Sequence, residues 1–325
     1  MKCKNKLIKI LIFLILIIPL TTLAYSPYVI PGGETIGIEV NSKGILVVGF
    51  YEIDNKYIAK DAGFKLGDTI IKINNKEVES INEMIDTINT HKDNIIDFTI
   101  LRNNKEEKIK LTIKDDKILK TGIYVKDKIN GVGTLSYIDP TTKIFGSLGH
   151  EIIENKTAKK FEIKDGKIYE ANVSSINKSK IGNAGEKNAI YNKNELFGNI
   201  KENDITGIYG IYTDNITKKE TIEVGNKSDI TIGPAKIRTV IKDNIVEEFD
   251  IKIIKINPTS DTKNILFEIT DENLLKETGG IIQGMSGSPI IQNNKLIGAV
   301  NYVILNSPTK GYGIFITTML KEGEN

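Results

Sequence analysis

Short apolar, β-branched runs alternate with polar turn residues along most of the chain. IGIEV (36–40) and GILVVGF (44–50) begin this pattern, and SDITIG (228–233) and ILFEIT (265–270) continue it. Runs of this length, bounded by Gly, Asn, Asp and Lys, are typical of β-strands joined by turns. INEMIDTIN (81–89) departs from the pattern because its apolar residues have helical spacing. The chain is therefore predicted to be mainly β.

The N-terminus has a different pattern. Basic residues in MKCKNK (1–6) precede an apolar run over residues 10–20, and the small residues Thr22 and Ala24 follow it. The run is shorter than the roughly 20 residues of a membrane-spanning helix and resembles the apolar part of a signal peptide. Residues 1–25 are thus predicted to be a signal peptide or an N-terminal membrane anchor, and the rest of the chain is expected outside the cytoplasm.

Residues 30–114 read as one compact module. Two strands, a glycine turn, a third strand, the helix and a hairpin with Asn103 and Asn104 at its turn follow one another. The stretch AGFKLGDTIIKINNKEV (62–78) resembles the most recognisable segment of PDZ domains. This resemblance implies a small, partly open barrel.

The PDZ resemblance also implies a peptide-binding groove. Such a groove captures a carboxylate with loop amides and pairs its strand with an extended peptide. The residues that fit the loop pattern are Thr35, Ile36, Gly37 and Ile38. Plain core packing is the alternative for the two isoleucines.

Residues 115–122 are polar and are interpreted as a linker. The remaining residues, 123–325, contain short strands separated by turns and no long amphipathic helix before the tail. This arrangement favours an all-β barrel or a pair of barrels.

Two motifs in this second region carry candidate chemistry. GMSGSP (284–289) places serines between glycines, and IFGSLGHEI (144–152) contains the region's one histidine. A serine hydroxyl needs a base to become a nucleophile, and imidazole is suited to that role near neutral pH. His150 precedes Ser286 in the chain, and this order resembles that of the catalytic residues in chymotrypsin-like hydrolases. That resemblance implies a double β-barrel, with the amides of Gly284 and Ser286 forming the oxyanion hole. A tight turn without catalytic function is the alternative.

Composition excludes several other functions. Lys plus Arg numbers 44 against 42 for Asp plus Glu, and only Arg102 and Arg238 offer a guanidinium, so nucleic acid is not an expected partner. The chain has one cysteine, Cys3, and two histidines, His91 and His150, without the spacing of a zinc site. Neither a metal nor a cofactor is predicted.

Several blocks in order resemble the stage IV sporulation protein B peptidases. They include VIPGGETIGIEV (29–40), the segment TGGIIQGMSGSPIIQNNKLIGAV (278–300) and TKGYGIFI (309–316). The resemblance implies a serine endopeptidase in the space between mother cell and forespore membranes. Its expected substrates are its own N-terminal region and the exposed part of a membrane-bound sporulation regulator. Cleavage of that regulator is expected to trigger intramembrane proteolysis and late sigma-factor signalling.

The resemblance also implicates Asp271, fifteen residues before Ser286, as the acid of the site. Asp204 and Asp214 are alternatives in sequence order, and a helix cap is the other interpretation of Asp271. The chain has Asn301 and Tyr302 where the family pattern leads us to expect Thr-His.

Other functions therefore stay open. A divergent paralogue with another sporulation substrate is one, and a catalytically silent PDZ-containing binding protein is another. A quality-control protease-chaperone is less favoured, because such proteins carry the PDZ domain after the protease.

Overall fold

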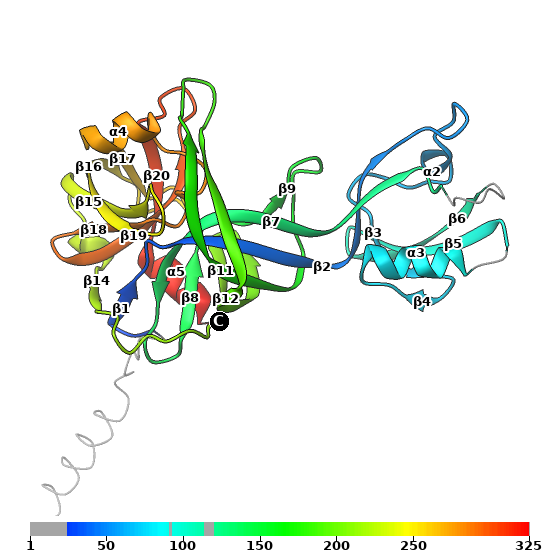
Figure 1. Ribbon diagram of the computed structural model, residues 1–325, viewed down its shortest axis with the longest axis horizontal. Coiled ribbons are helices and arrows are strands. Elements are labelled where there is room, and N and C mark those ends of the chain that lie inside the picture. Colours follow the sequence, from blue (N-terminus) through cyan, green and yellow to red (C-terminus); the bar gives the residue numbers. More distant parts are fainter. Residues whose placement is uncertain (1–24, 91–92, 114–119, 325) are drawn as a thin grey trace, which may run out of the picture.

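The structure, a computed structural model, describes residues 25–90, 93–113 and 120–324 (Figure 1). Strands dominate it, as predicted. A large β-rich body and a small module lie at opposite ends of the molecule, and two long strands run from one to the other. These strands are β2 (Thr35–Phe50) and β7 (Ile123–Ile138). Residues 1–24 of the predicted N-terminal segment lie outside the described residues. Within the described residues, none of the helices has the length and apolar character needed to cross a membrane.

Six strands of the large body form a closed ring, which we call the first ring. Each strand pairs antiparallel with the next, and the last pairs with the first. In order around the ring they are β2, β7, β8 (Ile144–Ser147), β13 (Gly207–Tyr212), β12 (Glu186–Asp204) and β11 (Ile163–Asn177). Their buried apolar side chains form one core, which includes Ile36, Ile38, Leu135, Phe145 and Ile168.

Six further strands close a second ring in the same way. They are β15 (Gly233–Val240), β16 (Val246–Ile256), β17 (Ile265–Ile269), β20 (Lys310–Phe315), β19 (Lys295–Val303) and β18 (Pro289–Gln292). In β16, Phe249, Ile251 and Ile253 are buried whereas Asp250 and Lys252 are exposed. This alternation places one face of the strand in the core and the other in solvent.

Short elements join the two rings. The strand β1 (Tyr28–Pro31) pairs with β7 of the first ring and with β14 (Ile222–Val224), which pairs with β19 of the second. The remaining elements of the large body are β9 (Ile153–Glu154), β10 (Lys159–Lys160), the 3₁₀ turn η1 (Lys227–Asp229), α4 (Glu272–Thr278) and α5 (Ile316–Gly323).

The small module combines the second half of β2 and the first part of β7 with six local elements. These are α2 (Ile58–Asp61), β3 (Thr69–Ile73), β4 (Lys76–Glu77), α3 (Ile81–Asn89), β5 (Ile95–Arg102) and β6 (Lys105–Thr112). The predicted hairpin turn is confirmed, since Asn103 and Asn104 have φ of 49° and 60° between β5 and β6. Positive φ at both central residues is typical of the tight turns that join antiparallel strands.

The first strand of the predicted module belongs to the first ring. Residues 35–41 pair with β7 on one edge, and residues 36–42 pair with β11 on the other. A strand paired on both edges cannot accept a peptide by strand addition. The groove predicted at Thr35, Ile36, Gly37 and Ile38 is therefore wrong. The two isoleucines are core residues of the ring, the alternative that the sequence left open.

This shared strand leads to a prediction about folding. Asn41 and Lys128 are register partners, so a two-residue Asn-Gly turn joining them should replace the whole small module. The shortened chain should keep cooperative thermal unfolding, because the first ring remains closed. A chain that starts at Lys120 lacks β1 and β2 and should lose cooperativity, since β7 and β11 lose the strand between them. Circular dichroism during heating checks both variants, and cooperative unfolding of the chain starting at Lys120 would contradict the prediction.

Candidate active site

The turn that carries Ser286 requires glycine at two positions. Gly284 and Gly287 have φ of 93° and 94°, which is left-handed backbone that favours glycine. A Cβ at Gly287 would lie 2.0 Å from the carbonyl oxygen of Thr134. The turn then enters β18 at Pro289. Glycine is thus needed both for the backbone conformation and for the close approach of β7.

Thr134 on β7 binds this turn directly. Its side-chain hydroxyl donates to the carbonyl oxygen of Gly284 at 2.7 Å, and its amide donates to the carbonyl oxygen of Ser286 at 2.9 Å. Thr134 is fully buried, so breaking either bond would leave polar groups without a partner. A strand of the first ring therefore fixes the serine turn, which precedes a strand of the second ring.

Two amides of the turn stay free of hydrogen bonds. Those of Met285, Gly287 and Ser288 donate to the carbonyl oxygens of Ile282, Val300 and Met285. Within the described chain, the amides of Gly284 and Ser286 have no acceptor. These are the two donors that the sequence predicted for an oxyanion hole.

The two serines of the motif have different surroundings. Ser286 is half-buried, and its hydroxyl makes one long contact, 3.4 Å to the carbonyl oxygen of Asn301. Ser288 is fully buried, and its hydroxyl has no hydrogen-bond partner in the described part of the structure. Only Ser286 is therefore accessible to react.

His150 follows a sharp bend at the end of β8. Leu148 and Gly149 both have left-handed φ, 71° and 69°. Leucine rarely adopts this conformation, and such strain is often found at functional sites. The imidazole stacks on the ring of Tyr302, with centroids 5.6 Å apart. Ser286 contacts Asn301, so the predicted base and nucleophile lie beside neighbouring residues of β19. Within the described residues, no hydrogen bond joins the two side chains.

The hydrogen bond of His150 defines its tautomer. Nδ1 lies 2.8 Å from the carbonyl oxygen of Glu151, and a carbonyl can only accept. Nδ1 therefore carries the proton, and Nε2 presents a lone pair. Burial of the ring lowers the pKa of His150, although the Glu151 carbonyl and carboxylate oppose this shift. The imidazole is thus neutral near pH 7 and suited to act as a base.

The structure places Asp271 at the N-terminus of α4. Its carboxylate accepts from the amide of Leu274 at 2.9 Å and from the amide of Asp250 at 3.4 Å. No hydrogen bond joins it to His150 within the described chain. These contacts are those of a helix cap. The spacing of fifteen residues from Ser286 could not predict them, because spacing does not determine which way the carboxylate faces.

The two alternative acids do not complete the site either. Asp204 accepts hydrogen bonds from the amide and hydroxyl of Thr206. Neither Asp204 nor Asp214 is hydrogen-bonded to His150 in the residues that the structure describes. The imidazole is oriented instead by a backbone carbonyl and by Tyr302, the residue that replaces the expected histidine.

Two other features could bind a ligand. Carboxylate oxygens of Glu202, Asp204 and Glu322 lie within 4.8 Å of one another, and they form a group that could hold a metal ion. Asp204 and Glu202 belong to β12 and Glu322 to α5, so the group shares no residue with the candidate active site.

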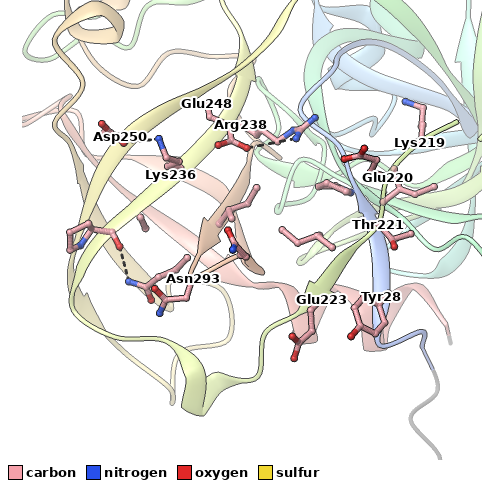
Figure 2. A pocket seen from close by; sticks show the side chains of 18 of the residues that line it. Tyr28, Lys219, Glu220, Thr221, Glu223, Lys236, Arg238, Glu248, Asp250 and Asn293 are labelled. Atoms are coloured by element: carbon pink, nitrogen blue, oxygen red, sulfur yellow. Dashed lines mark hydrogen bonds and ion pairs between the residues drawn. The ribbon is translucent and has the colours of Figure 1, made fainter.

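A cavity of about 930 Å³ lies between β1, β14, β15 and β18 (Figure 2). Charged side chains on its wall form pairs. Lys236 lies 3.0 Å from Asp250, and Arg238 lies 3.7 Å from Glu248. In each pair the positive and negative charges offset each other. None of the predicted catalytic residues lines the cavity.

Comparison with known families adds independent information. The family described as SpoIVB peptidase S55 matches residues 117–320, and a PDZ domain matches residues 35–113. No curated protein matches the chain. The first match covers more than half of the chain and contains both His150 and Ser286. The chain therefore belongs to the SpoIVB peptidase S55 family and is a serine peptidase with a PDZ domain.

Proposed function

We propose that this serine peptidase is an extracytoplasmic endopeptidase of bacterial sporulation. Its substrates are its own N-terminal region and the exposed part of a membrane-bound regulator in the space between mother cell and forespore membranes. Cleavage of the regulator starts intramembrane proteolysis and late sigma-factor signalling. The family match supports a role in sporulation, and the apolar run over residues 10–20 supports export and association with the membrane.

One observation carries the catalytic part of the proposal: the amides of Gly284 and Ser286 are free beside an accessible serine hydroxyl. In the proposed reaction, Nε2 of His150 takes the hydroxyl proton while Oγ of Ser286 bonds to the substrate carbonyl carbon. The two amides stabilise the negative oxygen. The imidazolium then gives its proton to the leaving amine, and water hydrolyses the acyl-enzyme by the same route.

The two closed rings support a double-barrel peptidase of the chymotrypsin-like kind. His150 lies at the end of a strand of the first ring, and Ser286 lies before a strand of the second. A catalytically silent protein has no need for two unpaired amides in its serine turn. Tyr302 against His150 favours a divergent member of the family, whose substrate differs from that of the standard sporulation peptidase.

The first prediction tests the nucleophile and the base. Ser286→Ala and His150→Ala should each lower kcat by several orders of magnitude, because they remove groups that bond to the reacting atoms. Ser288→Ala is the matched control and should retain measurable activity, since that side chain is buried. Cleavage of the purified protein by itself and of a peptide substrate measures the effect. Full activity in Ser286→Ala would show that Ser286 is not the nucleophile, whereas no cleavage by the wild type would support the binding-protein alternative.

The second prediction concerns pH. Because burial lowers the pKa of His150 below its ordinary value of 6.5, the base stays unprotonated under mildly acidic conditions. On the acidic side, kcat/KM should therefore fall with a midpoint below pH 6.5. A pH series with a soluble peptide measures this acid limb. A midpoint above 6.5 would contradict a desolvated, neutral imidazole.

The third prediction separates a helix cap from a catalytic acid at Asp271. Asp271→Ala should reduce the free energy of unfolding by about 1 kcal/mol, whereas Asp271→Ser should keep most of it, because serine also caps helices. Both variants should keep kcat/KM within a few-fold of the wild type. Denaturant unfolding and peptide cleavage measure the two effects. Loss of activity by roughly 10⁴-fold in both variants would assign Asp271 to the catalytic site instead.

A further inference from the structure

Lys187 on β12 is a buried lysine without a carboxylate partner among the described residues. Its side chain is 4% exposed, and Nζ donates to the hydroxyl of Thr239 at 2.8 Å and to that of Thr35 at 3.4 Å. Thr35 belongs to the first ring and Thr239 to the second. Burying an ammonium with only hydroxyl partners is unfavourable, because hydroxyls do not replace the lost hydration.

This lysine lies directly against the serine turn. Its amide donates to the carbonyl oxygen of Gln283 at 2.9 Å. A Cβ built on Gly284 would lie 3.1 to 3.2 Å from the Cβ, Cγ and Cδ of Lys187. The lysine stem therefore packs on the glycine whose amide is one of the two free donors, and Nζ lies two bonds beyond Cδ.

The charged residues near Lys187 have other partners. Glu186, its neighbour on β12, accepts from the side-chain amide of Asn177. Glu34, beside Thr35, pairs with Lys219 through Oε1, while its Oε2 is buried without a hydrogen-bond partner among the described residues. Arg238, beside Thr239, pairs with Glu248. No charged side chain of β2, β12, β15 or the serine turn therefore compensates the ammonium. Burial lowers the pKa of Lys187 to about 7.

We propose that Lys187 is a positioning residue of the oxyanion site. Its stem holds Gly284 in the left-handed conformation, and its protonated ammonium gives the site a positive potential where the substrate oxygen becomes negative. Both hydrogen bonds of Nζ go to threonine hydroxyls, so Lys187 has a positioning role and His150 stays the proposed base. This inference rests on the proposed peptidase function and adds a residue to the same site.

Loss of the Lys187 proton at higher pH should have opposite effects on activity and on stability. Activity needs the charged form, so kcat should fall as the pH rises through about 7. The folded protein binds the Lys187 proton less tightly than the unfolded chain does. The contribution of this group to stability should therefore increase as the pH rises from about 7 toward 10.5, the ordinary pKa of lysine.

The test compares Lys187→Met and Lys187→Arg with a matched control, Lys193→Met, on the same strand. Lys193 is exposed and pairs with Glu39. Steady-state cleavage of a soluble peptide is measured from pH 5 to 10, together with thermal unfolding. Lys187→Met should lower kcat about tenfold with little change in KM. Its kcat should no longer fall as the pH rises through about 7, which is the alkaline limb of the profile. The variant should unfold at an equal or higher temperature, because a buried charge is removed. Lys187→Arg keeps the charge, so it should keep more activity than Lys187→Met and lose the alkaline limb near pH 7, because arginine stays protonated.

Each remaining outcome has a defined meaning. Unchanged kcat and pH profile in Lys187→Met would overturn the inference. If kcat and the unfolding temperature fall together in Lys187→Met, the residue has a structural role only, and the inference is overturned as well. Lys193→Met should match the wild type throughout. If the wild type shows no cleavage that depends on Ser286, the proposed function itself fails, which is a separate result.

Discussion

The two hydrogen bonds from Thr134 to the serine turn are the contact on which the candidate active site depends. The proposed nucleophile and the proposed base come from different rings, so neither ring alone can set their separation. Thr134 lies on β7 and fixes the carbonyl oxygens of Gly284 and Ser286. Its own carbonyl oxygen accepts from Leu148, at 3.5 Å, in the bend before His150. One buried residue therefore relates the positions of the Ser286 turn and the bend before His150.

The environment of His150 shows how the proposed base can be prepared without a hydrogen bond to a carboxylate. The carbonyl of Glu151 selects the tautomer with a free Nε2, and burial disfavours the charged ring. A carboxylate would also stabilise the imidazolium that forms during the reaction, whereas a carbonyl offers only a dipole. In the proposed mechanism, more of the electrostatic stabilisation then comes from the free amides of Gly284 and Ser286. A buried ammonium behind Gly284 is suited to that need.

Local patterns in the sequence predicted local features well. The glycines around Ser286, the histidine after a glycine-rich strand end and the Asn103–Asn104 turn each depend on residues within a few positions, and the structure contains all of them. Contacts between distant segments could not be predicted. Ile36 and Ile38 suit any buried strand, so their pattern could not tell a ring strand from a groove strand.

The same limit explains what was missed at the site. Thr134 is 150 residues from the glycine it binds, and Lys187 is about a hundred residues from the turn it supports. Neither has a motif of its own. Tyr302 did leave a signal, because it departs from the family pattern, but its stacking on the imidazole could be seen only in three dimensions.

The continuity of β2 and β7 between module and ring has a mechanical consequence. The two strands are joined side by side, so a pull on the module loads their hydrogen bonds in shear, and a one-residue slip would turn buried side chains outward. Residues 42–45 of β2 bulge between the partners Asn41–Lys128 and Leu46–Lys126, and Gly44 there has φ of 93°. Bulges bend strands. The bulge is therefore a point at which β2 can bend between the module and the ring, whereas β7 continues from the module to Thr134.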